Sequence, residues 1–71
     1  MSNLRTQFGK RIRQIRRQRN MTQEQLANAA EVSVEFISYI ERGINAPSFK
    51  TIEKLAEALD VAPVELFIFA Q

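Results

Sequence analysis

Residues 21–43, MTQEQLANAAEVSVEFISYIERG, have the pattern of two short helices joined by a tight turn. Thr22 is a favourable N-cap, and Gln25 stands at the third helical position, where its side chain completes a capping box. Apolar residues at helical spacing predict one helix from about Gln23 to Ala30 and a second from about Val34 to Arg42. Because so few residues separate them, the two helices must cross steeply, as in a helix-turn-helix.

Further helices are predicted on both sides of this stretch. Apolar residues at steps of four, four and three predict a helix from about Leu4 to Arg19, with a stripe of Leu4, Phe8, Ile12 and Ile15. Ser48 caps another helix, whose apolar stripe consists of Phe49, Ile52, Leu55, Ala56 and Leu59. Pro63 begins a short fifth helix, because a proline at the first position loses no hydrogen bond.

The fold class that follows is all-α. We expect a compact five-helix bundle that forms a single domain over residues 1–71, with the helix-turn-helix at about residues 22–42.

Charge is distributed unevenly along the chain. The segment from Met1 to Arg19 carries seven of the ten Lys and Arg residues and no acid, whereas the segment from Asn20 to Gln71 carries three basic and eight acidic residues. This asymmetry, with an isoelectric point near 9.5, suits a nucleic-acid partner. The alternative is that the basic first helix neutralises acidic faces of the later helices, including Glu53, Glu57, Asp60 and Glu65.

Several short motifs follow one another at characteristic separations. They are Thr22-Gln23-Glu24-x-Leu26-Ala27, Val32-Ser33, Ile37-Ser38, Ile40-Glu41-Arg42-Gly43, Pro47-Ser48, Leu55-Ala56-x-Ala58-Leu59 and Glu65-Leu66-Phe67. From about Phe8 to Phe67 the chain resembles the phage-repressor-like helix-turn-helix family, which includes xenobiotic-response-element-type regulators and the controller proteins of restriction-modification systems. The resemblance implies a transcriptional regulator whose partner is double-stranded DNA.

The resemblance also implies that residues 33–42 form the recognition helix and that five exposed side chains contact bases: Ser33, Val34, Glu35, Ser38 and Tyr39. Val34 can contact a thymine methyl group, and Glu35 can accept a hydrogen bond from a cytosine amino group. The alternative for Val34 is packing at the edge of the core. These positions hold no arginine or glutamine that could bind a base through two hydrogen bonds, so we expect each base contact to be weak.

Contacts to the DNA backbone are assigned to four other residues. Gln23 matches the glutamine that opens the corresponding helix in the family, where the helix N-terminus meets a phosphate. The further candidates for phosphate contact are Arg42, Asn45 and Lys50.

Two further expectations follow from the family pattern. Arg16 and Glu41 are expected to form an ion pair that ties the first helix to the end of the recognition helix. Glu31 and Asp60 stand where the family favours glycine in a left-handed conformation, and each is expected to cost about 1 kcal/mol.

Weak base contacts in a small domain favour a homodimer on two half-sites. Apolar residues near the C-terminus are the predicted dimer interface: Phe67, Ile68 and Phe69. The alternative is that they fold back over the first helix.

Histidine and cysteine are absent, so imidazole and thiolate ligands and a histidine base are not available. We expect no metal, no cofactor, no small-molecule ligand and no enzymatic activity. The longest apolar run, Leu66 to Ala70, is too short to span a bilayer, so we expect no membrane partner and a cytoplasmic location.

A second hypothesis is a protein-interaction or antitoxin-like module that keeps this fold. Glu35 and the uncharged loop residues Ile44 and Ala46 favour that hypothesis, whereas Gln23 and the basic N-terminal third favour DNA.

Overall fold

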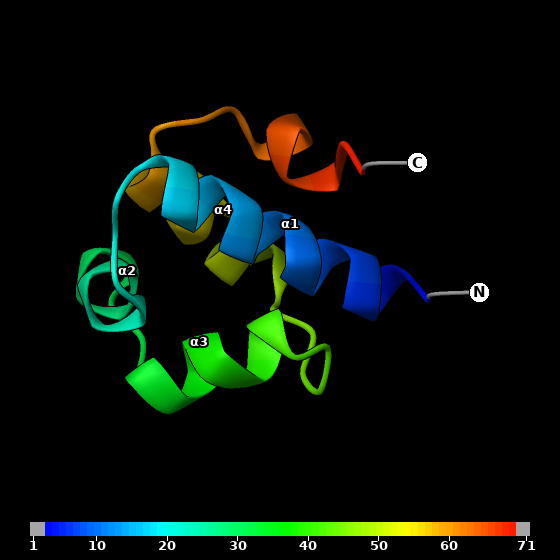
Figure 1. Cartoon of the computed structure of the whole chain (residues 1–71), viewed down its shortest axis with the longest axis horizontal. Coiled ribbons are helices and arrows are strands. Elements are labelled where there is room, and N and C mark those ends of the chain that lie inside the picture. The colour runs from blue at the N-terminus through cyan, green and yellow to red at the C-terminus, as the bar shows by residue number, and fades with distance from the viewer. Residues whose placement is uncertain (1–2, 70–71) are drawn as a thin grey trace.

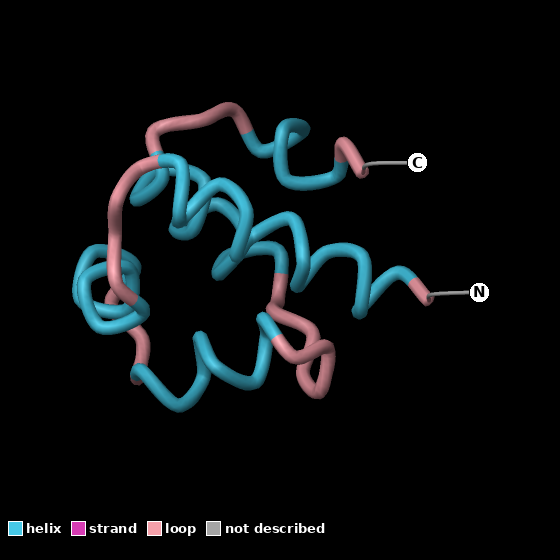
Figure 2. The backbone as a smooth tube through the Cα atoms, viewed as in Figure 1, coloured by secondary structure: helices cyan, strands magenta, loops and turns pink. Residues whose placement is uncertain are grey.

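Helices make up all the regular secondary structure of residues 3–69, the part of the chain that the computed structural model describes. In chain order they are α1 (Leu4–Gln18), α2 (Gln23–Ala30), α3 (Val34–Glu41), α4 (Phe49–Leu59) and the 3-10 helix η1 (Pro63–Phe67). Figures 1 and 2 show α1 crossing the molecule, with α3 on one side of it and η1 on the other. The α1 helix packs on α3 and η1, and α2 packs on α3 and α4.

The all-α fold class is confirmed, with one correction to the fifth helix. Residues 3–69 contain four α-helices, and the fifth helix, η1, is a 3-10 helix of five residues. Its N-cap position is Ala62, which offers no side-chain hydrogen bond, so Pro63 begins the helix without a capped first turn. Such short segments commonly adopt the tighter 3-10 geometry.

Each α-helix begins with a polar side chain that accepts a hydrogen bond from a backbone N–H three residues later. The four N-caps are Asn3, Thr22, Ser33 and Ser48. At Thr22 the capping box is complete, because the Gln25 side chain also accepts from the Thr22 N–H at 2.8 Å. These caps fix the starts of α2 and α3, and with them the length of the turn between the two helices.

The four α-helices also end in the same backbone motif. A residue just after each helix adopts the left-handed conformation, with φ between 57° and 75°: Asn20, Glu31, Gly43 and Asp60. In each case the N–H of the next residue donates to the carbonyl five residues earlier, as Val32 does to Ala27 at 3.0 Å. The left-handed conformation expected for Glu31 and Asp60 is confirmed, and it strains both residues because they carry a Cβ atom.

The core fills the space enclosed by the five helices. Its fully buried large side chains come from every helix: Ile12, Leu26, Ile37, Ile40, Leu55, Leu59 and Leu66. Two residues that the sequence assigned to apolar stripes lie outside it. Leu4 is 60% exposed and Phe49 is 85% exposed, because each is the first residue of its helix and extends past the end of the core.

Gly9 allows α1 to approach α3 closely. A Cβ atom at Gly9 would overlap the carbonyl oxygen of Ile40 and would lie 3.0 Å from the carbonyl oxygen of Glu41. Both oxygens belong to the backbone at the end of α3 and cannot move aside as a side chain would. The absence of a side chain at Gly9 therefore sets the distance between the first helix and the end of α3.

We expect Gly9→Ala to lower the free energy of unfolding by about 2 kcal/mol, because it overpacks this contact. Alanine favours an isolated helix over glycine by roughly 0.5 to 1 kcal/mol, so the sign of the change reports on the contact rather than on helix propensity. Urea denaturation followed by circular dichroism measures it. Arg13→Ala, at an exposed position of the same helix, should change stability by less than about 0.5 kcal/mol. A Gly9→Ala variant as stable as the wild type would contradict the close approach.

Candidate nucleic-acid interface

The predicted base-contacting residues share the outer face of α3. Ile37 and Ile40 are fully buried and orient the helix on the core. With that face held, Ser33, Val34, Glu35 and Tyr39 are exposed and Ser38 is half-buried. Val34 is 37% exposed, so it lies at the border between the core and the outer face. The structure therefore brings all five residues to one side of a short helix.

Arg42 and Tyr39 form a contact at the end of α3. The Arg42 guanidinium lies over the Tyr39 ring, 5.1 Å from its centre, and Arg42 Nε donates to the Ser38 carbonyl at 3.4 Å. A cation over an aromatic face is attracted by the ring quadrupole. The guanidinium is thus held beside the exposed face of α3, where it can reach an anionic group through its remaining N–H donors.

Arg16 and Glu41 form a buried ion pair between α1 and the end of α3. Arg16 Nε donates to Glu41 Oε2 at 2.6 Å, and Arg16 Nη2 donates to Glu41 Oε1 at 3.1 Å. The side chains are 11% and 4% exposed, respectively. Arg16 Nη1 also donates to the Met21 carbonyl at 2.7 Å, which ties the same guanidinium to the turn before α2. The two-point pairing is the strong geometry for an arginine and a carboxylate.

Gln23 belongs to this network. As the first residue of α2, it directs its side-chain Nε2 to Glu41 Oε1 at 3.1 Å. One N–H of the amide is thereby used, and the second stays available to a further acceptor. The N-terminus of α2 and the C-terminal end of α3 are therefore joined through one carboxylate.

The other two predicted phosphate contacts lie beyond α3. Asn45 is exposed in the loop between α3 and α4, and its N–H donates to the Tyr39 carbonyl at 3.4 Å. Lys50 is exposed in the first turn of α4. The loop thus holds Asn45 against the end of α3, whereas Lys50 projects from a separate helix.

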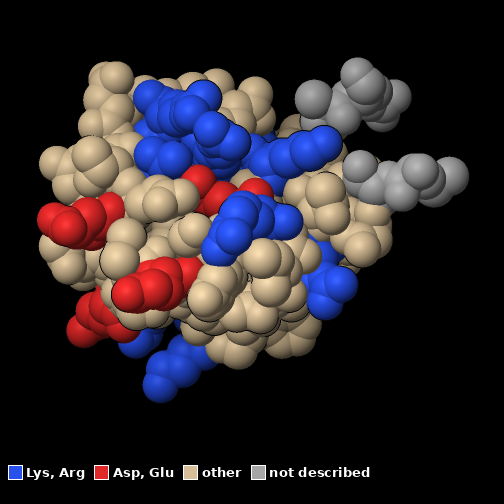
Figure 3. Space-filling model, turned by 60° about the horizontal axis from the view of Figure 1, so that its bottom comes forward, with Lys and Arg blue, Asp and Glu red and all other residues tan. Residues whose placement is uncertain are grey.

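The basic residues of α1 are mostly not neutralised within the chain. Among residues 3–69, the α1 residues in ion pairs are Arg16 and Arg11, whose Nη2 lies 3.5 Å from Glu65 Oε2. Of the four acidic residues considered as partners of the first helix, Glu65 is the one with an ion pair to it in this range. Figure 3 shows a cluster of Lys and Arg in the upper part of this face, further basic side chains at its centre, lower right and bottom, and acidic side chains toward the left and centre. The positive charge of α1 therefore remains on the surface.

The predicted dimer residues are partly folded onto α1. The Phe67 ring lies 5.1 Å from the Phe8 ring, centre to centre, and Phe69 lies 6.4 Å from Phe67. Phe69 is half-buried against the core, whereas Phe67 is 39% exposed and Ile68 is 52% exposed. The Phe67 ring therefore contacts α1, as the alternative expects, while Phe67 and Ile68 still expose apolar surface, and the dimer interface stays a prediction.

Two contacts of this site were not predicted from the sequence. The Gln23 to Glu41 hydrogen bond joins residues 18 positions apart, and no local pattern signals it. The stacking of Arg42 on Tyr39 joins residues three apart at the end of a helix, a spacing that brings side chains together and could have indicated the pair.

Within residues 3–69, no group of three or more acidic side chains is placed so that it could hold a metal ion. None of the helices in that range is both long and apolar enough to cross a membrane.

The geometry defines the class of the protein. The short, partly exposed helix α3 follows α2 after a tight turn, and a buried ion pair ties the end of α3 to α1. This is the architecture of a helix-turn-helix protein.

Comparison with known proteins gives the family. The helix-turn-helix family model HTH_3 matches residues 12–66. The control protein C.BamHI of Bacillus amyloliquefaciens is 44% identical over 69 residues, which cover 96% of this chain and 85% of that protein. The HTH-type transcriptional regulator YazB of Bacillus subtilis is 39% identical over 59 residues, covering 83% and 86% of the two chains.

A solved structure agrees with these relatives. The restriction-modification controller protein C.AhdI from Aeromonas hydrophila superposes with a TM-score of 0.86 at 39% identity, covering 87% of this chain and 94% of that one. The chain belongs to the HTH_3 helix-turn-helix family and, with it, to the DNA-binding transcriptional regulators.

We expect the Arg16 and Glu41 pair to show strong coupling in a double-mutant cycle. Arg16→Met or Glu41→Leu alone should lower the free energy of unfolding by about 3 to 5 kcal/mol, because each leaves a buried charge without its partner. The double variant should lose less than the sum of the two single losses, with a coupling free energy on the order of 2 kcal/mol. Urea denaturation measures all four proteins, and Arg17→Met, at an exposed neighbouring arginine, is the control. A coupling near zero would refute the role of the pair.

Proposed function

We propose that this protein binds an inverted-repeat operator as a homodimer, with α3 of each subunit in the major groove. The observation that carries the proposal is the outer face of α3, which is exposed along its length while Arg16 and Glu41 anchor the helix from behind. An α-helix fits the major groove, where each base pair presents a distinct set of donors and acceptors. The proposal includes a cytoplasmic location, where operator DNA is found.

Each exposed residue of α3 has a specific role in this proposal. Val34 contacts a thymine methyl group, and Glu35 accepts from a cytosine amino group. Ser33, Ser38 and Tyr39 contribute hydroxyl groups that can donate to or accept from bases. Because none of them makes a two-point contact with a base, one half-site provides little discrimination. Two half-sites about 34 Å apart, read by a two-fold dimer, add their binding free energies.

The backbone contacts fix the register of α3 on the duplex. Gln23 retains a free N–H at the start of α2, where the helix dipole also favours a phosphate. Arg42 contributes a guanidinium that is already positioned by Tyr39 and by the Ser38 carbonyl. Asn45 and Lys50 complete the predicted set. With about three to five phosphates neutralised per subunit, the logarithmic salt slope of a dimer is about −5 to −9.

The similarity to C.BamHI and C.AhdI supports a role as a controller protein of a restriction-modification system. C.AhdI superposes on 87% of this chain, so the likeness extends to the helices on both sides of the helix-turn-helix.

We expect purified protein to select an inverted repeat from a pool of random duplexes at physiological salt. Sequencing of the retained duplexes should show two half-sites about one helical turn apart, because each α3 of a dimer occupies one major groove. Enrichment of a single half-site would contradict the dimer. Binding that is only salt-sensitive, with no enriched sequence, would contradict operator recognition and would favour the protein-interaction hypothesis.

On the selected operator, two variants should separate phosphate contact from base contact. Arg42→Gln should reduce the magnitude of the salt slope by about 2 per dimer, because one phosphate contact is lost in each subunit. Val34→Ala should leave the salt slope unchanged and relax the preference at one base pair in each half-site. Fluorescence anisotropy titrations at several salt concentrations measure both. An unchanged slope for Arg42→Gln would remove Arg42 from the phosphate contacts.

A further inference from the structure

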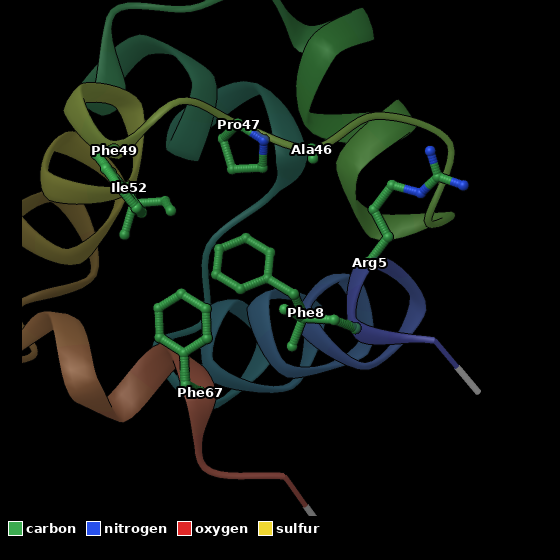
Figure 4. Close-up of a pocket in the computed structure, with 8 residues that line it drawn as sticks. Arg5, Phe8, Ala46, Pro47, Phe49, Ile52 and Phe67 are labelled. Carbon is green, nitrogen blue, oxygen red and sulfur yellow. The ribbon is translucent and has the colours of Figure 1, made fainter. Parts of the chain in front are cut away.

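An apolar groove of about 290 Å³ lies between the start of α1, the loop after α3, the start of α4 and η1. Apart from Ala46 and Arg5, its walls consist of Leu4, Phe8, Pro47, Phe49, Ile52 and Phe67. Figure 4 shows the Phe8 and Phe67 rings facing the groove from α1 and η1, and the Arg5 guanidinium turned away from them. The groove thus offers apolar contact and almost no polar partner.

Phe49 is the most exposed large apolar side chain in the described part of the chain. It stands at the edge of the groove with 85% of its surface exposed, and the core does not use it. Leu4 and Phe67, which also line the groove, are 60% and 39% exposed, respectively. By typical side-chain areas these three residues expose on the order of 350 Å² of apolar surface. Patches of this size on small proteins commonly mark an interaction site.

We infer that a second copy of this chain occupies the groove, with Phe49 of each subunit inserted into the groove of the other. A two-fold dimer joins a surface to an identical copy of itself, so the surface must carry both the inserted group and the site that receives it. Phe49 and the groove are adjacent on one face and meet that requirement. This inference rests on the proposed function, which requires a dimer, and it specifies where the two subunits meet.

The size and composition of the surface fit a dimer contact. The exposed apolar part is about half of the roughly 800 Å² that each partner buries in a standard interface. Interface cores are depleted in charge and enriched in aromatic residues, while the remaining area is a polar rim. Phe8, Phe49 and Phe67 are the aromatic residues here, and Arg5 lies at the edge with its charge directed away.

The position of the groove also suits a dimer whose two α3 helices bind two DNA half-sites. Leu4 and Arg5 in its wall precede Thr6, which lies against Gly43 just after α3, so the groove adjoins the C-terminal end of that helix. A two-fold axis beside the groove brings the C-terminal ends of both α3 helices near the same axis. The contact extends the predicted interface, because Phe67 forms one wall and Ile68 follows it.

Sedimentation equilibrium on wild-type, Phe49→Ala, Leu4→Ala and Val64→Ala proteins tests the inference. Val64 is the matched control, because it is 66% exposed and does not line the groove. Phe49→Ala should raise the dimer dissociation constant at least tenfold, Leu4→Ala should raise it several-fold, and Val64→Ala should leave it within about twofold. Circular dichroism checks that each variant is folded, which we expect because the core contains none of the three side chains.

The outcomes separate this inference from the proposed function. A wild-type dimer that Phe49→Ala does not weaken would place the contact elsewhere and overturn the inference, while leaving operator binding intact. A wild-type protein that stays monomeric at hundreds of micromolar, with and without operator DNA, would overturn both the inference and the dimeric function. Selection of an inverted repeat by a protein whose dimer depends on Phe49 and Leu4 would support both.

Discussion

The buried pairing of Arg16 with Glu41 fixes the position of α3, whose outer face we propose contacts DNA. One guanidinium binds the carboxylate at the end of α3 and the Met21 carbonyl before α2, and the same carboxylate accepts from Gln23. Three segments of the chain therefore meet at two side chains, close to where Gly9 lets α1 approach α3. Burial of such a pair contributes little net stability, but it sets one orientation of α3 relative to the start of α2.

The α3 helix and the loop that follows it contribute to two surfaces. The outer face of α3 carries Val34, Glu35 and Tyr39, which suit the major groove of DNA. The loop that follows it contributes Pro47 to the apolar groove, which suits a second subunit. Because α3 has only eight residues, a change in its orientation would move both its outer face and the loop that contributes to the groove. In the dimer that we propose, the fixed geometry of the two subunits compensates for weak base contacts in each one.

Local sequence patterns predicted most of the fold, because caps and helix ends are local features. Thr22 and Ser33 fixed the starts of α2 and α3, and the left-handed residues fixed their ends. Contacts between distant segments were harder to predict. The Arg16 and Glu41 pair was expected from the family resemblance alone, and Phe49 was assigned to the core because periodicity does not show where a helix extends past its neighbours. The DNA-contacting roles remain predictions.

The domain can be stabilised at the left-handed residues that end α2 and α4, because both positions are strained. Glu31 and Asp60 each carry strain of about 1 kcal/mol, an appreciable share of the few kcal/mol by which a domain of this size is stable. Neither residue belongs to α3 or to the walls of the groove. Substitutions in α3 that change the preferred operator but weaken the fold can therefore be offset at these two positions. The domain is thus a suitable starting point for laboratory evolution of new DNA specificities.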